Sequence, residues 1–121
     1  DPQVASAGLD ERTARARGID VDSRTFDLGH ARRVSAGSQK RGFVKLIAEA
    51  RTGRLLGAQI VAREAGEMIQ SAVQAIRRRL SVYSLAGEDS TGLTMAAGLR
   101  SCAQTFIRTR PTAAEGPGSC E

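Results

Sequence analysis

Aromatic residues are scarce in this chain. Three Phe, one Tyr and no Trp make up 3% of its 121 residues. A core must therefore be built from aliphatic side chains, and the stacking aromatics typical of single-strand nucleic-acid binding are missing. No apolar run approaches the ~20 residues that a membrane span needs, and no basic-then-apolar signal segment opens the chain.

Cysteine and histidine are equally rare. Cys102 and Cys120 are too few for a disulfide scaffold, and with His30 as the only histidine no metal-ligand spacing is present. We therefore expect a reducing, cytoplasmic environment. The chain starts at Asp1 without a Met, which suggests an excised domain or a processed fragment.

The composition is otherwise that of a globular protein. A length of 121 residues, 40% of them hydrophobic and 26% charged, indicates one domain. The net charge is +5, nearly all of it from arginine. This charge permits a basic nucleic-acid-binding module that uses Arg32, Arg33 and Arg77 to Arg79, which we keep as an alternative from another functional class.

The chain is organised around a predicted hairpin and helix between Arg41 and Leu80. Two runs alternate between a strongly apolar face and a mixed face, on either side of a turn at Arg51 to Gly53. The first strand sets Val44, Leu46 and Ala48 against Phe43, Lys45, Ile47 and Glu49. The second sets Leu56, Ala58, Ile60 and Ala62 against Leu55, Gly57, Gln59 and Val61. The mixed face is apolar enough to predict a second covered surface, such as one against a partner chain.

Helices and further strands are expected around this hairpin. The long helix starts near Ala65 and carries an apolar stripe to Leu80. The other predicted elements are an edge strand at Val4 to Ala7, a surface helix at Leu9 to Arg17 with Asp10 as cap and Gly18 as stop, a strand at Ile19 to Leu28, a frayed strand at Ala31 to Ala36, a short helix at Ser81 to Ala86 with Ser81 as cap, and a last helix at Met95 to Ile107.

The predicted fold class is α+β, with an antiparallel sheet of three to five strands packed with helices. Residues 1–107 form the expected domain. From Arg108 the sequence turns polar and contains Pro111, Gly116, Pro117 and Gly118, so residues 108–121 are expected to be a flexible tail.

Single residues with chemical potential have simpler interpretations. His30 lies in a polar connection and is expected to have no catalytic role. Cys102 lies on the apolar side of the last helix and is expected to be a buried small hydrophobe. Glu88 and Asp89 are typical of a solvated turn. Cys120, in the tail, is a candidate soft-metal ligand, and a small thiol-based metal binder is a further alternative.

Several short motifs in one order carry a family resemblance. They are Asp1-Pro2-Gln3-Val4-Ala5 with Gly8, Gly18-Ile19, Ser23-Arg24-Thr25, Arg41 to Leu46, Gly53 to Gly57, Ala65 to Gln70, Leu93-Thr94-Met95, Gly98-Leu99 and Ala103 to Phe106. In this order they resemble the C-terminal dimerisation domain of mercuric reductases, a group of flavoprotein pyridine nucleotide-disulfide oxidoreductases. The resemblance spans Asp1 to Phe106.

The resemblance implies a domain that pairs with a second copy about a two-fold axis and lines the partner's active site. Leu93, Met95 and Leu99 are the residues expected near that axis. FAD and NAD(P)H are implied for the full-length family, with their sites and the redox-active cysteine pair in upstream domains. The isolated chain is therefore expected to contain no cofactor-binding or catalytic residue and to reduce nothing by itself.

This chain departs from the family at the positions that carry chemistry. Ser90-Thr91-Gly92 stands where relatives have a His-containing motif or, in mercuric reductases, Phe-Pro-Tyr. Ala97 stands where a Glu is often found. Cys120 is alone where mercuric reductases end in a cysteine pair, so it cannot perform a two-sulfur transfer of mercury.

Overall fold

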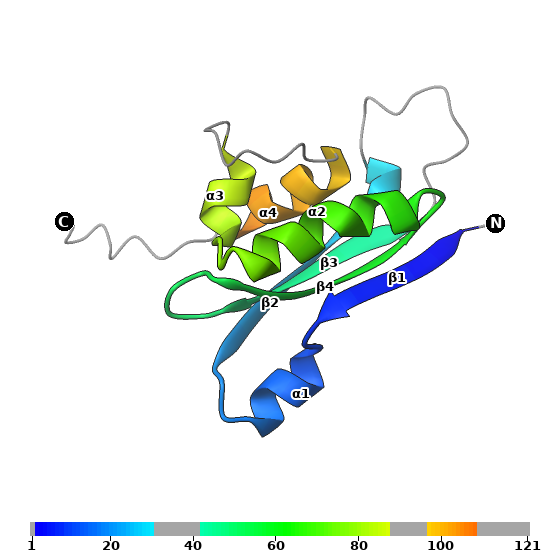
Figure 1. The fold of residues 1–121 in the computed structure, drawn as a ribbon. Coiled ribbons are helices and arrows are strands. Elements are labelled where there is room, and N and C mark those ends of the chain that lie inside the picture. The colour runs from blue at the N-terminus through cyan, green and yellow to red at the C-terminus, as the bar shows by residue number, and fades with distance from the viewer. Residues whose placement is uncertain (1, 31–41, 88–96, 109–121) are drawn as a thin grey trace.

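The computed structural model describes residues 2–30, 42–87 and 97–108, and Figure 1 shows how their elements are arranged. In chain order these are β1 (Gln3–Gly8), α1 (Glu11–Ala16), β2 (Val21–Asp27), the 3-10 helix η1 (Leu28–His30), β3 (Phe43–Glu49), β4 (Leu55–Ala62), α2 (Ala65–Arg77), α3 (Val82–Ala86) and α4 (Ala97–Arg108). The predicted α+β class is confirmed.

The predicted hairpin forms the centre of a four-stranded sheet. The strand order is β1-β4-β3-β2, and every neighbouring pair is antiparallel. Between β3 and β4 the chain turns at Gly53, whose φ of +80° suits glycine and whose N–H donates to the Glu49 carbonyl at 2.8 Å. The strands predicted near Val4 and Ile19 therefore become the two edges of this sheet.

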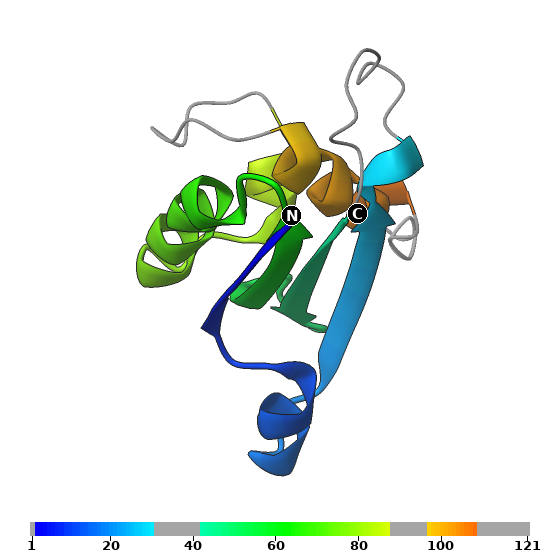
Figure 2. The ribbon, with the colours of Figure 1, turned by 90° about the vertical axis from the view of Figure 1, so that its right-hand side faces the viewer.

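Three helices cover one face of the sheet. Helix α2 packs over β1 and β4, α4 packs over β2 and β3, and α3 packs against α4 (Figures 1 and 2). The Gln3 side-chain oxygen accepts a hydrogen bond from the Gly66 N–H at 2.9 Å, which ties the first turn of α2 to β1. The core between them is aliphatic, as the scarcity of aromatics predicted, and its fully buried large side chains include Val44, Leu46, Leu55, Ile60, Val82 and Leu99.

The remaining helix, α1, lies on the opposite side of the sheet (Figure 1). Its predicted cap is confirmed, because the Asp10 carboxylate accepts a hydrogen bond from the Thr13 N–H at 2.7 Å. Its predicted stop is confirmed as well, because Gly18 has a φ of +82°. Only Ala14 of α1 is buried, which agrees with the expected surface helix.

One part of the predicted strand alternation is wrong. Ala48 pairs with Leu55 and Ile47 pairs with Gly57, so Leu56 is an extra, unpaired residue in β4. This bulge reverses the alternation, because Leu55 joins the core beneath α2 and α4 while Leu56 packs with Ile47 on the side of α1. The prediction assumed an unbroken alternation along β4, so it assigned Leu55 and Leu56 each to the wrong face of the sheet.

Several element ends also differ from the predictions. Helix α2 ends at Arg77 rather than Leu80, because the chain leaves the helix through a left-handed residue at Arg79. The expected strand from Ile19 to Leu28 is shorter at both ends and passes into η1. Ser81 caps α3 as predicted, with its hydroxyl accepting from the Ser84 N–H at 3.1 Å. The frayed strand predicted at 31–36 lies outside the described residues, and so do residues 109–121 of the predicted tail. Arg108, assigned to that tail, is the last residue of α4.

Candidate functional site

The residues predicted to form the interface and metal site are only partly described. Leu93, Met95 and Cys120 lie outside the described residues, and so do Glu88, Asp89 and the segment 90–92. His30 ends η1, but its side chain is outside the description. Their assigned roles therefore stay predictions. Ala97 begins α4 and is exposed.

Leu99 is the described member of the predicted interface. It is 1% exposed and lies in the core with Cys102, Ala103 and Phe106 from the same helix. Arg24 of β2 places its guanidinium 5.1 Å from the centre of the Phe106 ring, which fixes α4 against the sheet. Leu99 is already buried within the single chain, so contact with a partner adds little to its burial. Its contribution to an interface is to hold α4 in place against the core.

Cys102 is buried, as predicted, and its surroundings keep it unreactive. Its Sγ lies 3.4 Å from the carbonyl oxygens of Arg24 and Val44, within hydrogen-bonding distance for a thiol donor. Burial raises the pKa of the Cys102 thiol to about 11, so it is protonated near neutral pH. A protonated and inaccessible thiol is neither a nucleophile nor a ready metal ligand.

The face of the sheet opposite α2 and α4 is covered at one end. Ala14, Val21, Ile47 and Leu56 form a second buried cluster there, with Leu9 and Ile19 packed against it. The backbones are close at this point, since a Cβ on Gly57 would lie 1.9 Å from the Leu9 carbonyl oxygen. The predicted second covered surface is thus supplied in part by α1 and its flanking residues.

An electrostatic group ties α1 to the sheet beside this cluster. Glu11 contacts the Lys45 Nζ at 3.1 Å and the Arg15 guanidinium at 2.9 Å, and it accepts a hydrogen bond from the Ser23 hydroxyl. Its hydrogen bonds to Arg15 and Lys45 lower the pKa of the Glu11 carboxyl to about 2. Sequence reasoning found the acid-first pattern of this helix but missed Lys45 as its partner, since the pairing depends on the strand register.

The other end of this face carries an apolar row. Val4 pairs with Val61, and Val61 pairs with Phe43 across the central hairpin. Val4 is 78% exposed, Val61 and Phe43 are half-buried, and all three lie outside both buried clusters. A contact of this row with a partner chain stays a prediction.

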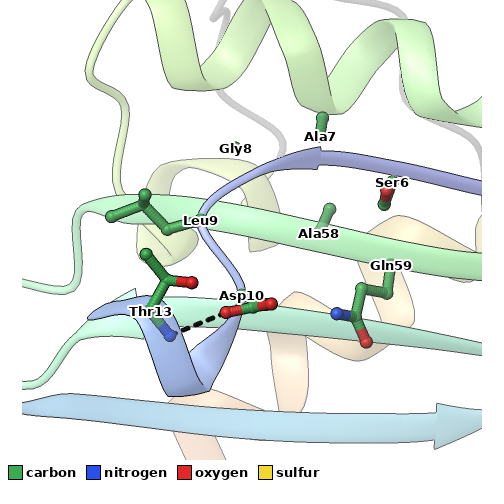
Figure 3. Close-up of a pocket in the computed structure, with 8 residues that line it drawn as sticks. All are labelled: Ser6, Ala7, Gly8, Leu9, Asp10, Thr13, Ala58 and Gln59. Atoms are coloured by element: carbon green, nitrogen blue, oxygen red, sulfur yellow. Dashed lines mark hydrogen bonds between the residues drawn. The ribbon is translucent and has the colours of Figure 1, made fainter. Parts of the chain in front are cut away.

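A small pocket of about 180 Å³ opens between the end of β1 and α1 (Figure 3). Ser6, Asp10, Thr13 and Gln59 supply its polar side chains. The Asp10 carboxylate is engaged as the helix cap, and this bond lowers its pKa. The Ser6 and Thr13 hydroxyls have no histidine beside them in this lining to act as a base, and Asp10 is engaged as the cap, so the pocket lacks an activated nucleophile. We interpret this pocket as a consequence of the Asp10 cap rather than as a binding site.

The described residues form neither a metal-binding cluster nor a membrane-spanning helix. Within 2–30, 42–87 and 97–108, His, Cys, Asp and Glu nowhere gather in a group of three or more that could hold a metal ion. None of the helices described is long and apolar enough to cross a bilayer. The described geometry is therefore that of a packed domain with one partly open face.

Comparisons with known proteins agree with this description. A family model for the pyridine nucleotide-disulphide oxidoreductase dimerisation domain matches residues 1–102. Mercuric reductase from Shewanella putrefaciens is 51% identical over 106 residues, which cover 88% of this chain and 19% of that protein. Mercuric reductase from Serratia marcescens is 50% identical over 108 residues, which cover 89% and 24%. The chain thus spans about a fifth of the length of these relatives.

Solved structures show the same fold. LpdA from Mycobacterium tuberculosis superposes with a TM-score of 0.74 at 23% identity, covering 87% of this chain and 23% of that one. An NAD-dependent persulfide reductase from A. fulgidus gives a TM-score of 0.71 at 25% identity, covering 91% and 21%. In both cases the similarity is confined to a fraction of a longer chain.

Proposed function

The chain belongs to the pyridine nucleotide-disulphide oxidoreductase dimerisation-domain family, and we propose that it forms the subunit interface of a mercuric-reductase-like homodimer. The observation that carries this proposal is the family match over residues 1–102, together with mercuric reductases about 50% identical over most of the chain. The comparisons support neither the nucleic-acid-binding alternative nor the small metal binder. We also propose a cytoplasmic location, on the basis of the low cysteine content.

The family is flavin- and pyridine-nucleotide-dependent, and we propose that FAD and NAD(P)H bind the parent protein outside this chain. Two pockets among the described residues have volumes of about 180 and 240 Å³, below the roughly 300–1,000 Å³ of sites for drug-sized ligands, so neither of these two fits a dinucleotide. The isolated chain is accordingly proposed to be catalytically inactive.

We propose that the two-fold axis passes near Leu93, Met95 and Leu99. The support is structural continuity, because α4 begins directly after the segment that holds the first two residues and is anchored in the core by Leu99. In the parent, this segment and the tail are proposed to line the partner's active site. An altered charge in this segment should therefore affect association more than folding.

Sedimentation velocity at micromolar concentration tests the interface. We expect the chain to sediment as a dimer and the Met95→Arg variant to sediment as a monomer with unchanged circular dichroism. Gln70→Arg, which places the same charge on an exposed position of α2, should remain dimeric. Leu99→Arg is unsuitable, because a buried charge there would unfold the domain. A strictly monomeric wild-type chain would contradict the proposal.

A further inference from the structure

A second pocket, of about 240 Å³, lies where the end of β1, the start of β4 and the C-terminal end of α2 meet. Its accessible aliphatic side chains are those of the half-buried Leu9 and Ile76, because Leu55 and Leu56, which also line it, are only 1% and 6% exposed. Its charged side chains are two arginines, Arg54 and Arg79, and the residues that line it include no acid. The lining of the pocket therefore combines apolar side chains with positive charge and includes no negative charge.

Neither arginine forms an ion pair within the part of the chain that the structure describes. The ion pairs between described residues join Glu11 to Arg15 and Lys45, and Asp22 to Arg24, and none of them involves Arg54 or Arg79. Arg54 is half-buried and Arg79 is exposed. An anion bound in this pocket therefore meets two positively charged lining residues and no acidic one. Guanidinium is also the side-chain group best shaped to bind a carboxylate or phosphate with two hydrogen bonds.

The backbone at Arg79 adds an independent observation. Arg79 follows the C-cap of α2 and has a φ of +56°, the left-handed conformation that glycine normally supplies at this position. The Leu80 N–H donates to the Ala75 carbonyl at 3.0 Å and the Arg79 N–H to the Ile76 carbonyl at 3.1 Å, which together form a Schellman motif. A residue with a Cβ is disfavoured here, yet an arginine occupies the position and lines the pocket. Such local strain often accompanies a functional position.

We propose that this pocket binds a small organic anion with a carboxylate or phosphate headgroup and a short aliphatic chain. Arg54 and Arg79 hold the headgroup, and the aliphatic chain packs against Leu9 and Ile76. Binding there requires neither a second subunit nor a flavin, so this inference is independent of the proposed dimer. The net charge of +5 favours the approach of any anion, so the test must separate general attraction from a specific site.

Calorimetric titration of the 121-residue chain with octanoate and with octyl phosphate tests the site. We expect saturable binding of one molecule of at least one probe, and the tighter of the two identifies the headgroup. Octylamine, which has the same chain and the opposite charge, should not bind, and inorganic phosphate should bind more weakly than octyl phosphate. Absence of saturable binding of both anionic probes at millimolar concentration would overturn the proposal.

Matched arginine variants locate the binding. Arg54→Gln should weaken the affinity about tenfold, as expected for a lost hydrogen bond to a charged group. Arg77→Gln removes the same charge from an exposed position of α2 that does not line the pocket, and should change the affinity less than twofold. Equal weakening by both variants would show general electrostatic attraction and would overturn the site.

Arg79→Gly separates binding from folding. Glycine relieves the left-handed conformation, so the midpoint of thermal unfolding should rise by a few degrees while the affinity for the probe falls about tenfold. A loss of affinity in a more stable protein cannot be attributed to misfolding. A variant with unchanged affinity would overturn the role of Arg79 and with it the two-arginine site.

Discussion

The two faces of the sheet differ in how completely the chain covers its own apolar side chains. Beneath α2 and α4, Leu46 and Ile60 are fully buried along the length of the central strands. On the opposite face Ile47 is equally buried at the end covered by α1, whereas Val4 at the other end is 78% exposed. Aliphatic side chains thus occur on both faces, and the cover above them decides which ones stabilise the single chain.

Truncating one side chain from each face tests this difference in cover. Leu46→Ala should lower the free energy of unfolding by about 2–5 kcal/mol, because it removes buried methyl groups and leaves a cavity. Val4→Ala should change it by less than about 0.5 kcal/mol. Denaturant titration measures both values. Comparable losses for the two variants would mean that the open end of the sheet is covered in solution.

A second prediction concerns pH on the helix-covered face. The pKa of the Cys102 thiol is about 11 in the folded chain, against an ordinary value of 9.0. The unfolded state therefore loses this proton first, so the stabilisation is complete below pH 9 and is lost as the pH rises through 11. The loss should amount to roughly 2–3 kcal/mol. In Cys102→Ala, the free energy of unfolding measured between pH 8 and 11 should not show this decrease. An equal decrease in the variant and the wild-type chain would contradict the burial of the thiol.

A smaller effect of pH is expected at the α1 end of the opposite face. The pKa of the Glu11 carboxyl is about 2, below its ordinary value of 4.5, so its stabilisation is present above pH 4.5 and is lost as the pH falls through 2. Because solvent screens these contacts, Glu11→Gln should cost only about 0.2–1 kcal/mol at neutral pH. Added salt should reduce that difference.

A matched variant checks the Glu11 contacts. Glu64→Gln alters an exposed carboxyl whose side chain makes no capping hydrogen bond, so it should leave the free energy of unfolding nearly unchanged. Equal effects of the two substitutions would show that net charge, rather than the contacts of Glu11 with Lys45 and Arg15, determines the difference.

Local patterns predicted most of the fold. The hairpin turn at Gly53, the caps at Asp10 and Ser81, and the buried position of Cys102 all follow from short-range spacing and are confirmed. The faces of Leu55 and Leu56 could not be predicted, because a bulge leaves no periodic signal and depends on how β3 and β4 pair. Sequence patterns describe each strand separately, whereas the register belongs to two strands at once.

The functional positions were harder to predict than the fold. A family resemblance was needed to suggest the subunit interface, because its residues form no chemical motif. The pocket beside Arg54 and Arg79 was missed, since these residues lie apart in the sequence and only the return of the chain after α2 brings them together. The one available signal was an arginine at the position after a helix where glycine is usual.

The strand order has a consequence for how the chain reaches its folded state. The central hairpin and α2 are made from neighbouring segments, whereas β1 and β2 pair with opposite sides of that hairpin and are joined through α1. Contacts between nearby segments close smaller loops and generally form faster. We therefore expect the hairpin to form early and the N-terminal segment to add to both of its sides late. Until it does, both sides of the hairpin can pair with other chains, so aggregation should be greatest during this interval of refolding.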